Sequence, residues 1–301
     1  MQLKIFSSLS SADRRKFVER YLRFLRERDG SPDCKNSQLT QREATLRELA
    51  ANPIQRSGPA VVAQRVYDEN AVERDEAGAG LDRWSLWAVC LSKCSRAEEY
   101  AVRYLEATGR CRIGADDDPY TFIDLEERYH GRLLESLLQV IGVTPRWRKP
   151  RFRTRLALRA ILAAPKAVAN VTVLCGELIG VATFKLLWEA AQELCADQPP
   201  AKERMDFLLK QILTDEIGHV LFLRSQLGPI RLALSRVLLP IIARVLIADF
   251  PEMQRLFGAK RLLAEMLNPR LLQQALDEVG GLPLLTAWPA PQREFLPKAL
   301  P

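Results

Sequence analysis

The chain has 301 residues, 48% of them hydrophobic and 27% charged, a composition that excludes an intrinsically disordered or collagen-like protein. Its length allows one large domain or two small ones. The net charge is +7 at pH 7, but no zinc-finger spacing, RNP-type aromatic motif or basic zipper region accompanies it, so we expect no nucleic-acid partner.

The N-terminal residues 1–82 predict a helical lead-in to the rest of the chain. A helix is expected over 11–29 with a cap at Ser11, Ala12 and Asp13, and a shorter helix over 40–51. Loops are expected at 58–59 and 77–80 because glycine and proline interrupt the pattern there. No stretch alternates apolar and polar residues clearly enough to predict a strand, so the predicted fold class is all-α.

Four longer helices are predicted next, over residues 83–108, 119–141, 165–196 and 200–226. Short connections join the first helix to the second and the third to the fourth, while the longer basic segment 143–164 separates the two pairs. This pattern is typical of a ferritin-like four-helix bundle with one long crossover. We therefore predict a bundle over 83–228, with extra helices in 1–82 and 229–301 packed on its outside in one structural domain.

The chain contains two histidines, and each one lies three residues after a glutamate. Glu127 precedes His130 and Glu216 precedes His219, each pair within its own predicted helix. Residues i and i+3 project from one face of a helix, so a carboxylate and an imidazole at this spacing can bind the same metal ion. Coincidence is the alternative, since most single histidines are ordinary surface or core residues.

A metal centre with two ions needs two further carboxylates, one from each remaining helix. In the third helix Glu177 is the only acid between residues 167 and 187, and apolar residues surround it. An unpaired charge is costly to bury, so its partner is either a metal ion or a neighbouring arginine. In the first helix the adjacent Glu98 and Glu99 compete for the role. Helical periodicity places Glu98 on the apolar face and Glu99 on a more polar side, so we select Glu98.

These residues resemble the ferritin-like di-iron carboxylate superfamily. The resemblance covers about residues 83–228 and follows the ligand order helix by helix. It implies a centre of two iron ions, with manganese as an alternative metal, held by Glu98, Glu127, His130, Glu177, Glu216 and His219. In several members an acid directly before each motif hydrogen-bonds the histidine of the other motif. Glu126 and Asp215 occupy those positions here, although Glu126 could equally be a solvated helix residue.

The resemblance also has departures from some members of the superfamily. Several oxygenases carry a threonine about one turn after the third-helix glutamate, where this chain has Gly180 and Val181. Gly180 either opens room for dioxygen or substrate or allows close helix packing. The chain lacks the cysteine-pair iron domain usual in rubrerythrins and is longer than a ferritin.

The function that the resemblance implies is that of a non-haem di-iron oxygenase, an enzyme that uses dioxygen to hydroxylate or N-oxidise a small organic substrate. A ferroxidase or peroxidase without an organic substrate is the alternative. A third possibility is a helical binding module in which the two glutamate–histidine pairs are fortuitous.

Other features set expectations about location and partners. The six cysteines contain no C-x-x-C pair and residues 1–11 lack the apolar stretch of a signal peptide, so we expect a reducing, cytoplasmic location. Segment 232–250 is apolar but broken by Arg236, Pro240 and Arg244, which favours a buried or amphipathic helix over a membrane span. The basic run 146–153 is either solvated surface or a docking patch for an acidic electron donor or carrier protein.

Overall fold

The computed structural model describes residues 5–33, 36, 38–57, 80–108, 118–144, 149–150 and 152–280. Within these ranges the chain forms eleven helices and two strands of two residues each, so the all-α prediction is confirmed. The predicted loop at 58–59 and residues 77–79 of the predicted loop at 77–80 lie outside the described residues, as do residues 146–148 and 151 of the basic run 146–153.

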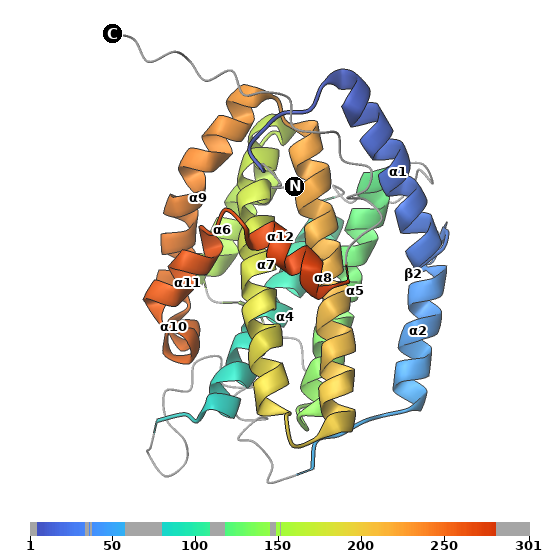
Figure 1. Cartoon of the computed structure of the whole chain (residues 1–301), viewed down its shortest axis with the longest axis vertical. Helices are drawn as coiled ribbons and strands as arrows, with labels where there is room; N and C mark the ends of the chain where they lie inside the picture. The colour runs from blue at the N-terminus through green and yellow to red at the C-terminus, as the bar shows by residue number, and fades with distance from the viewer. Residues whose placement is uncertain are drawn as a thin grey trace.

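The N-terminal part forms two helices that cover one side of the molecule (Figure 1). Helix α1 (Ser11–Asp29) begins at Ser10, whose side chain accepts a hydrogen bond from the Asp13 backbone N–H. The cap thus lies one residue before the predicted Ser11. After α1, strands β1 (Pro32–Asp33) and β2 (Gln38–Leu39) pair antiparallel and lead into α2 (Thr40–Ala51). Two-residue strands are too short to produce an alternating pattern, which explains why the sequence did not predict them.

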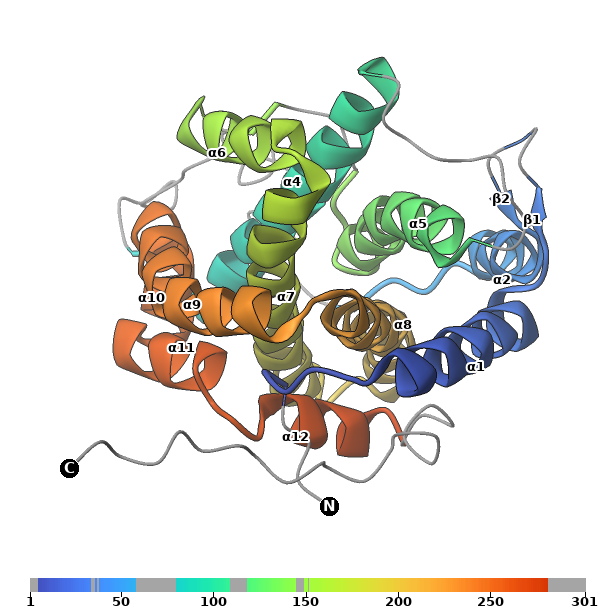
Figure 2. The ribbon, with the colours of Figure 1, turned by 90° about the horizontal axis from the view of Figure 1, so that it is seen from above.

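Four long helices form the centre of the molecule. They are α4 (Arg83–Ala107), α5 (Pro119–Val140), α7 (Lys166–Leu194) and α8 (Pro199–Gln226). Helix α4 packs on α5 and α7 on α8, while α5 also contacts α8 and α4 contacts α7. The four helices therefore enclose a common interior (Figure 2), and their bounds agree with the predicted ones to within two residues.

The remaining helices pack around this centre. Helix α6 (Phe152–Ala163) lies within the segment predicted only as a basic connection, and it packs on α4 and α7. After α8 the chain forms α9, α10, α11 and α12, which are Pro229–Asp249, Pro251–Phe257, Ala259–Met266 and Leu271–Glu278. Helix α9 packs on α7, α10 on α4, and α12 on both α7 and α8.

One described helix segment, Val168–Leu194 in α7, is long and apolar enough to cross a membrane by length and composition. This segment is not the apolar segment 232–250 that the sequence analysis considered as a membrane span. In the structure 67% of the most apolar window of Val168–Leu194 is buried among the other helices. A core helix of a globular protein has the same properties, so the segment is weak evidence for a membrane span.

Candidate metal centre

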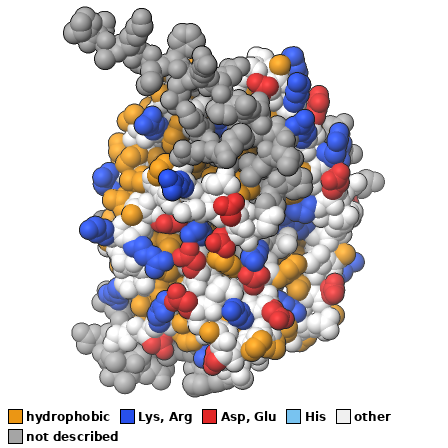
Figure 3. Space-filling model, in the orientation of Figure 1, with side chains coloured by type: hydrophobic (Ala, Val, Ile, Leu, Met, Phe, Trp, Pro, Cys, Tyr) orange, Lys and Arg blue, Asp and Glu red, His pale blue; other side chains and the backbone are white. Residues whose placement is uncertain are grey.

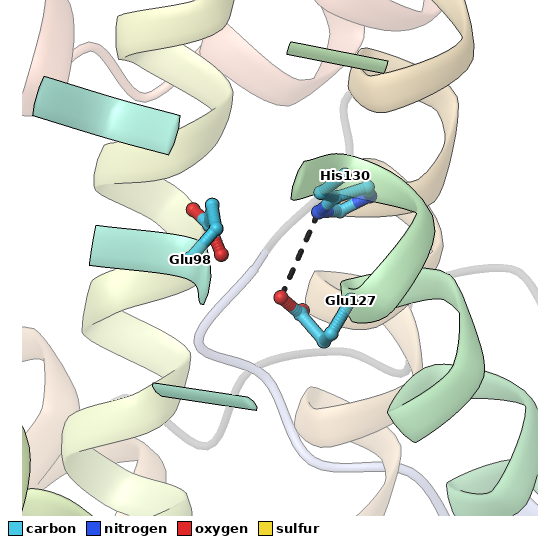
Figure 4. Close-up of side chains that lie close together, drawn as sticks. All are labelled: Glu98, Glu127 and His130. Atoms are coloured by element: carbon cyan, nitrogen blue, oxygen red, sulfur yellow. Dashed lines mark ion pairs between the residues drawn. The ribbon is translucent and has the colours of Figure 1, made fainter. Parts of the chain in front are cut away.

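The interior of the four long helices contains a cluster of carboxylates and imidazoles. Helix α4 contributes Glu98 and helix α7 contributes Glu177, while α5 and α8 each contribute one glutamate–histidine pair. Ligand-type atoms of Glu98, Glu127 and His130 lie within 4.8 Å of one another (Figure 4), and so do those of Glu127, Glu177 and His219. The two groups share Glu127. Each group could hold one metal ion.

Glu127 lies between the two imidazoles. Its Oε2 is 3.6 Å from His130 Nδ1, and its Oε1 is 3.2 Å from His219 Nδ1. The two rings have their centroids 5.7 Å apart. Glu216 Oε1 lies 3.6 Å from His130 Nδ1, and Glu177 Oε2 lies 3.4 Å from His219 Nδ1. The structure therefore brings all six predicted residues into one cluster, with each Nδ1 facing two carboxylates.

The outward nitrogen of each histidine contacts an acid on the other motif's helix. His130 Nε2 is 3.1 Å from Asp215 Oδ2, and His219 Nε2 is 3.0 Å from Glu126 Oε2. A carboxylate can only accept a hydrogen bond, so Nε2 carries the proton in both rings. In the neutral imidazole the lone pair is then on Nδ1, directed into the cluster. Glu126 is fully buried, which excludes the alternative that it is a solvated helix residue.

Two arginines and an aspartate from the N-terminal helices hold these outer acids in place. Arg28 forms ion pairs with both Glu126 and Asp215, the latter at 2.7 Å. Arg42 donates to Asp215 at 2.5 Å and to Asp29 at 2.6 Å. The sequence did not predict this layer. Asp29 could have indicated a buried ion pair, because it is an acid on the apolar side of the first helix. The sequence does not show, however, that α1 packs against α5 and α8.

Burial and neighbouring charges together set the pKa values of the carboxyl groups in the cluster. Burial, with the nearby Glu127 carboxylate, raises the pKa of Glu98 well above its usual range, and burial with the Glu177 carboxylate does the same for the pKa of Glu216. Burial would also raise the pKa of Glu127, but the two histidines outweigh it and hold that pKa below its usual range.

The surrounding carboxylates also raise the pKa values of the two imidazoles. Burial alone would lower the pKa of His130 and of His219, but the acids facing each ring outweigh it and raise both pKa values well above 6.5. Without a metal ion, the cluster therefore retains protons on the rings and on two of its carboxyl groups.

The two adjacent glutamates of α4 have different surroundings. Glu98 joins the cluster, whereas Glu99 accepts hydrogen bonds from Arg103 one turn along the same helix, at 2.6 and 3.0 Å. The selection of Glu98 over Glu99 thus agrees with the geometry.

Gly180 does not open free space beside Glu177. A Cβ atom added at this position would lie 2.5 Å from Glu216 Oε2, because the Glu216 carboxylate occupies that space. The missing side chain allows α8 to place this carboxylate next to α7, so the close-packing interpretation is the correct one.

No protein-family model matches the chain, and no curated protein or solved structure matches it either. The function therefore has to be inferred from the residues and the geometry of the cluster.

Proposed function

We propose that this chain is a ferritin-like di-iron carboxylate protein that uses dioxygen to oxidise a small organic substrate. The observation that carries the proposal is the position of Glu127 between two imidazoles whose outward nitrogens are both hydrogen-bonded to acids. Carboxylate and imidazole ligands suit iron and manganese, and the set contains no thiolate, which disfavours closed structural zinc.

The orphaned ring nitrogens support a cation at this position. Both Nδ1 atoms are buried and form no hydrogen bond in the described structure, although each faces two carboxylate oxygens. A lone pair that faces carboxylate oxygens is repelled unless a proton or a metal ion lies between them. Glu98, Glu127, His130 and Glu216 would hold one iron ion, and Glu127, Glu177 and His219 would hold the other.

The chain's own residues position the ligands and limit access to them. Asp215 and Glu126 fix the tautomer and orientation of the two rings, which strengthens Nδ1 as a ligand. The side chains of Glu127 and Glu177 remain 21% and 14% exposed, so solvent reaches the edge of the cluster. Two bound iron ions would supply the electrons for dioxygen chemistry, and the surrounding apolar core would exclude bulk water.

The extra helices favour an oxygenase over a ferroxidase or peroxidase. Helices α1 and α2 reinforce one side of the cluster through Arg28 and Arg42, and α9 to α12 add a second layer around α4, α7 and α8. Iron oxidation alone needs no such enclosure, whereas an organic substrate has to be enclosed and oriented.

The two adjacent glutamates of α4 provide a matched test of the metal centre. Iron content and anaerobic Fe(II) affinity should be measured for the wild type, Glu98→Gln and Glu99→Gln. We expect about two iron ions per chain in the wild type and in Glu99→Gln, and a loss of at least one ion in Glu98→Gln. Failure of the wild type to bind iron after reconstitution would refute the proposal.

Oxygen consumption then separates oxygenase from ferroxidase. The reduced protein should consume dioxygen, and suitable aromatic amines or hydrocarbons should incorporate labelled oxygen. Uptake that only oxidises added Fe(II), without any oxidised organic product, would support the ferroxidase alternative.

A further inference from the structure

Two stretches of this chain contain basic residues and no acid. Residues 136–176 hold eight arginines and lysines, and residues 217–248 hold four arginines. The rest of the chain has 32 basic and 37 acidic residues, which gives it a net charge of −5. The net charge of +7 therefore results entirely from these two stretches.

The fold places both acid-free stretches around the first half of α7. Helix α6 belongs to the first stretch and α9 to the second, and both helices pack on α7 (Figure 2). The Ser235 hydroxyl on α9 donates a hydrogen bond to the Val171 carbonyl near the start of α7, at 3.2 Å. The segments far apart in sequence thus form one side of the molecule.

Helix α9 has a buried apolar face and a second apolar face that points away from the protein. The inner face packs on α7 and includes Leu232, Leu239, Ala243 and Ile247, which are all buried. Five large side chains on the opposite side are 47% to 84% exposed, and we call them the outer α9 face: Ile230, Leu234, Val237, Ile241 and Val245. At 100° per residue they fall within an arc of about 80°, and they extend over about 22 Å of helix.

Arginines flank the outer α9 face. Counted at 100° per residue, Arg231 and Arg244 lie at the two borders of this face, whereas Arg236 lies towards the inner side. All three are exposed, and the first acid along the helix is Asp249 at its end. Figure 3 shows hydrophobic and basic side chains together along the edge of the molecule where α9 lies. On α6, which also packs on α7, Phe152 and Leu156 are 68% and 58% exposed. Exposed apolar residues in this number mark an interaction surface.

We infer that the outer α9 face binds an anionic membrane surface, with α9 parallel to the bilayer plane. The face consists of apolar side chains bordered by the guanidinium groups of Arg231 and Arg244. A bilayer with anionic lipids matches both features, because its negative headgroups can bind the guanidinium groups and its apolar interior can take up the apolar side chains. The positive charge alone would also suit an acidic protein, but the five outward apolar side chains require apolar material directly beneath the negative layer. Helix α9 does not span the bilayer, because its inner face is packed on α7.

Vesicle flotation tests this inference. The purified protein should be mixed with vesicles of phosphatidylcholine, with and without phosphatidylglycerol, at low and high salt. We expect binding to the vesicles that contain phosphatidylglycerol, and weaker binding at high salt. The double variant Val237→Ser and Ile241→Ser should bind at least about tenfold more weakly, because two apolar side chains no longer enter the interface.

Two control variants show whether a loss of vesicle binding is specific to the outer α9 face. Phe207→Ser removes an apolar side chain that is 38% exposed on α8, outside the outer α9 face, and should leave vesicle binding unchanged. Glu98→Gln should also bind vesicles like the wild type, so that failure of the metal centre does not affect this result. Circular dichroism and the melting temperature establish that each variant is folded.

Three results would overturn the inference. The first is equal or absent binding to the two kinds of vesicle, and the second is an equal loss of binding in Phe207→Ser. The third is a wild-type dimer in light scattering that becomes monomeric in the double variant without any vesicle binding. A second copy of the chain would then cover the outer α9 face.

Discussion

Replacing Gly180 by alanine should move a proposed metal ligand without unfolding the protein. The new Cβ would lie 2.5 Å from Glu216 Oε2, 3.1 Å from its Cδ and 3.5 Å from its Oε1. Ordinary contacts between such atoms are about 3.5 Å, so the carboxylate has to move by about 1 Å. The atoms in conflict lie at the end of a flexible side chain, and its rotation can relieve the clash while the helices stay in place.

The helix itself gains from the substitution. Alanine is favoured over glycine inside a helix by about 0.5–1 kcal/mol, because glycine loses more backbone freedom on folding. The metal-free Gly180→Ala protein should therefore melt within a few degrees of the wild type. A displacement of about 1 Å at a proposed ligand should lower the iron affinity of the proposed site next to His130 by roughly 10–100-fold, the range seen when the groups that position a ligand are altered.

Gly176 provides a matched control on the same helix. It lies one turn before Gly180, and a Cβ added there would meet no heavy atom within 4 Å. Gly176→Ala should raise the melting temperature by about 1–3 °C and leave iron binding unchanged. Anaerobic Fe(II) titration and thermal melts of the three proteins make the comparison. Wild-type iron affinity in Gly180→Ala, or an equal loss of affinity in both variants, would refute the reasoning.

Three further predictions concern the charges around the cluster. Arg42→Met leaves the buried Asp215 with one cation fewer, so it should lower the free energy of unfolding by about 3–5 kcal/mol in urea titrations. The hydrogen bond from Arg132 lowers the pKa of Glu43 below 4.5, so this pair should stabilise the fold above pH 4.5 and lose its effect as the pH falls through the lowered pKa. Arg132→Met should therefore destabilise the protein by less than about 1 kcal/mol at pH 7 and not at all in strong acid. Binding of two Fe(II) ions at pH 7 should release about four protons, those on His130, His219, Glu98 and Glu216, because ligands must be deprotonated to bind a metal ion. The release is measurable as a pH change in a weakly buffered solution, and release of no protons would contradict the raised pKa values.

The sequence predicted the central helices well because their signals are local. Proline at the start of a helix and glycine near its end mark boundaries, and the spacing of Glu127 and His130 places both on one face. The distinction between Glu98 and Glu99 followed from helical periodicity alone. These inferences needed only the pitch of a helix and the polarity of neighbouring residues.

Features that depend on contacts between distant helices were not predictable in the same way. Arg28 is one of several arginines near the end of α1, and nothing in its local sequence shows that it reaches Glu126 and Asp215, almost 100 and 190 residues away. Gly180 fits two interpretations until the position of Glu216 on α8 is known. The exposure of the outer α9 face could not be predicted from the sequence either, because an apolar helix with few charges is equally compatible with a buried position.

The negative charge of the cluster explains why Arg28 and Arg42 are needed beside the proposed metal centre. The four inner carboxylates, with Glu126, Asp215 and Asp29, bring seven acids together, and two guanidinium groups reduce their charge to −5. Two divalent cations would reduce it further to −1. Without metal, the protons held on the two rings and on the carboxyl groups of raised pKa, which are Glu98, Glu126 and Glu216, offset much of the same negative charge. Protons in the metal-free state, and divalent cations in the proposed metal-bound state, would thus both reduce the negative charge of the interior. Without the arginines, either state would leave two more negative charges buried, a cost that the packing of α1 and α2 against the bundle removes.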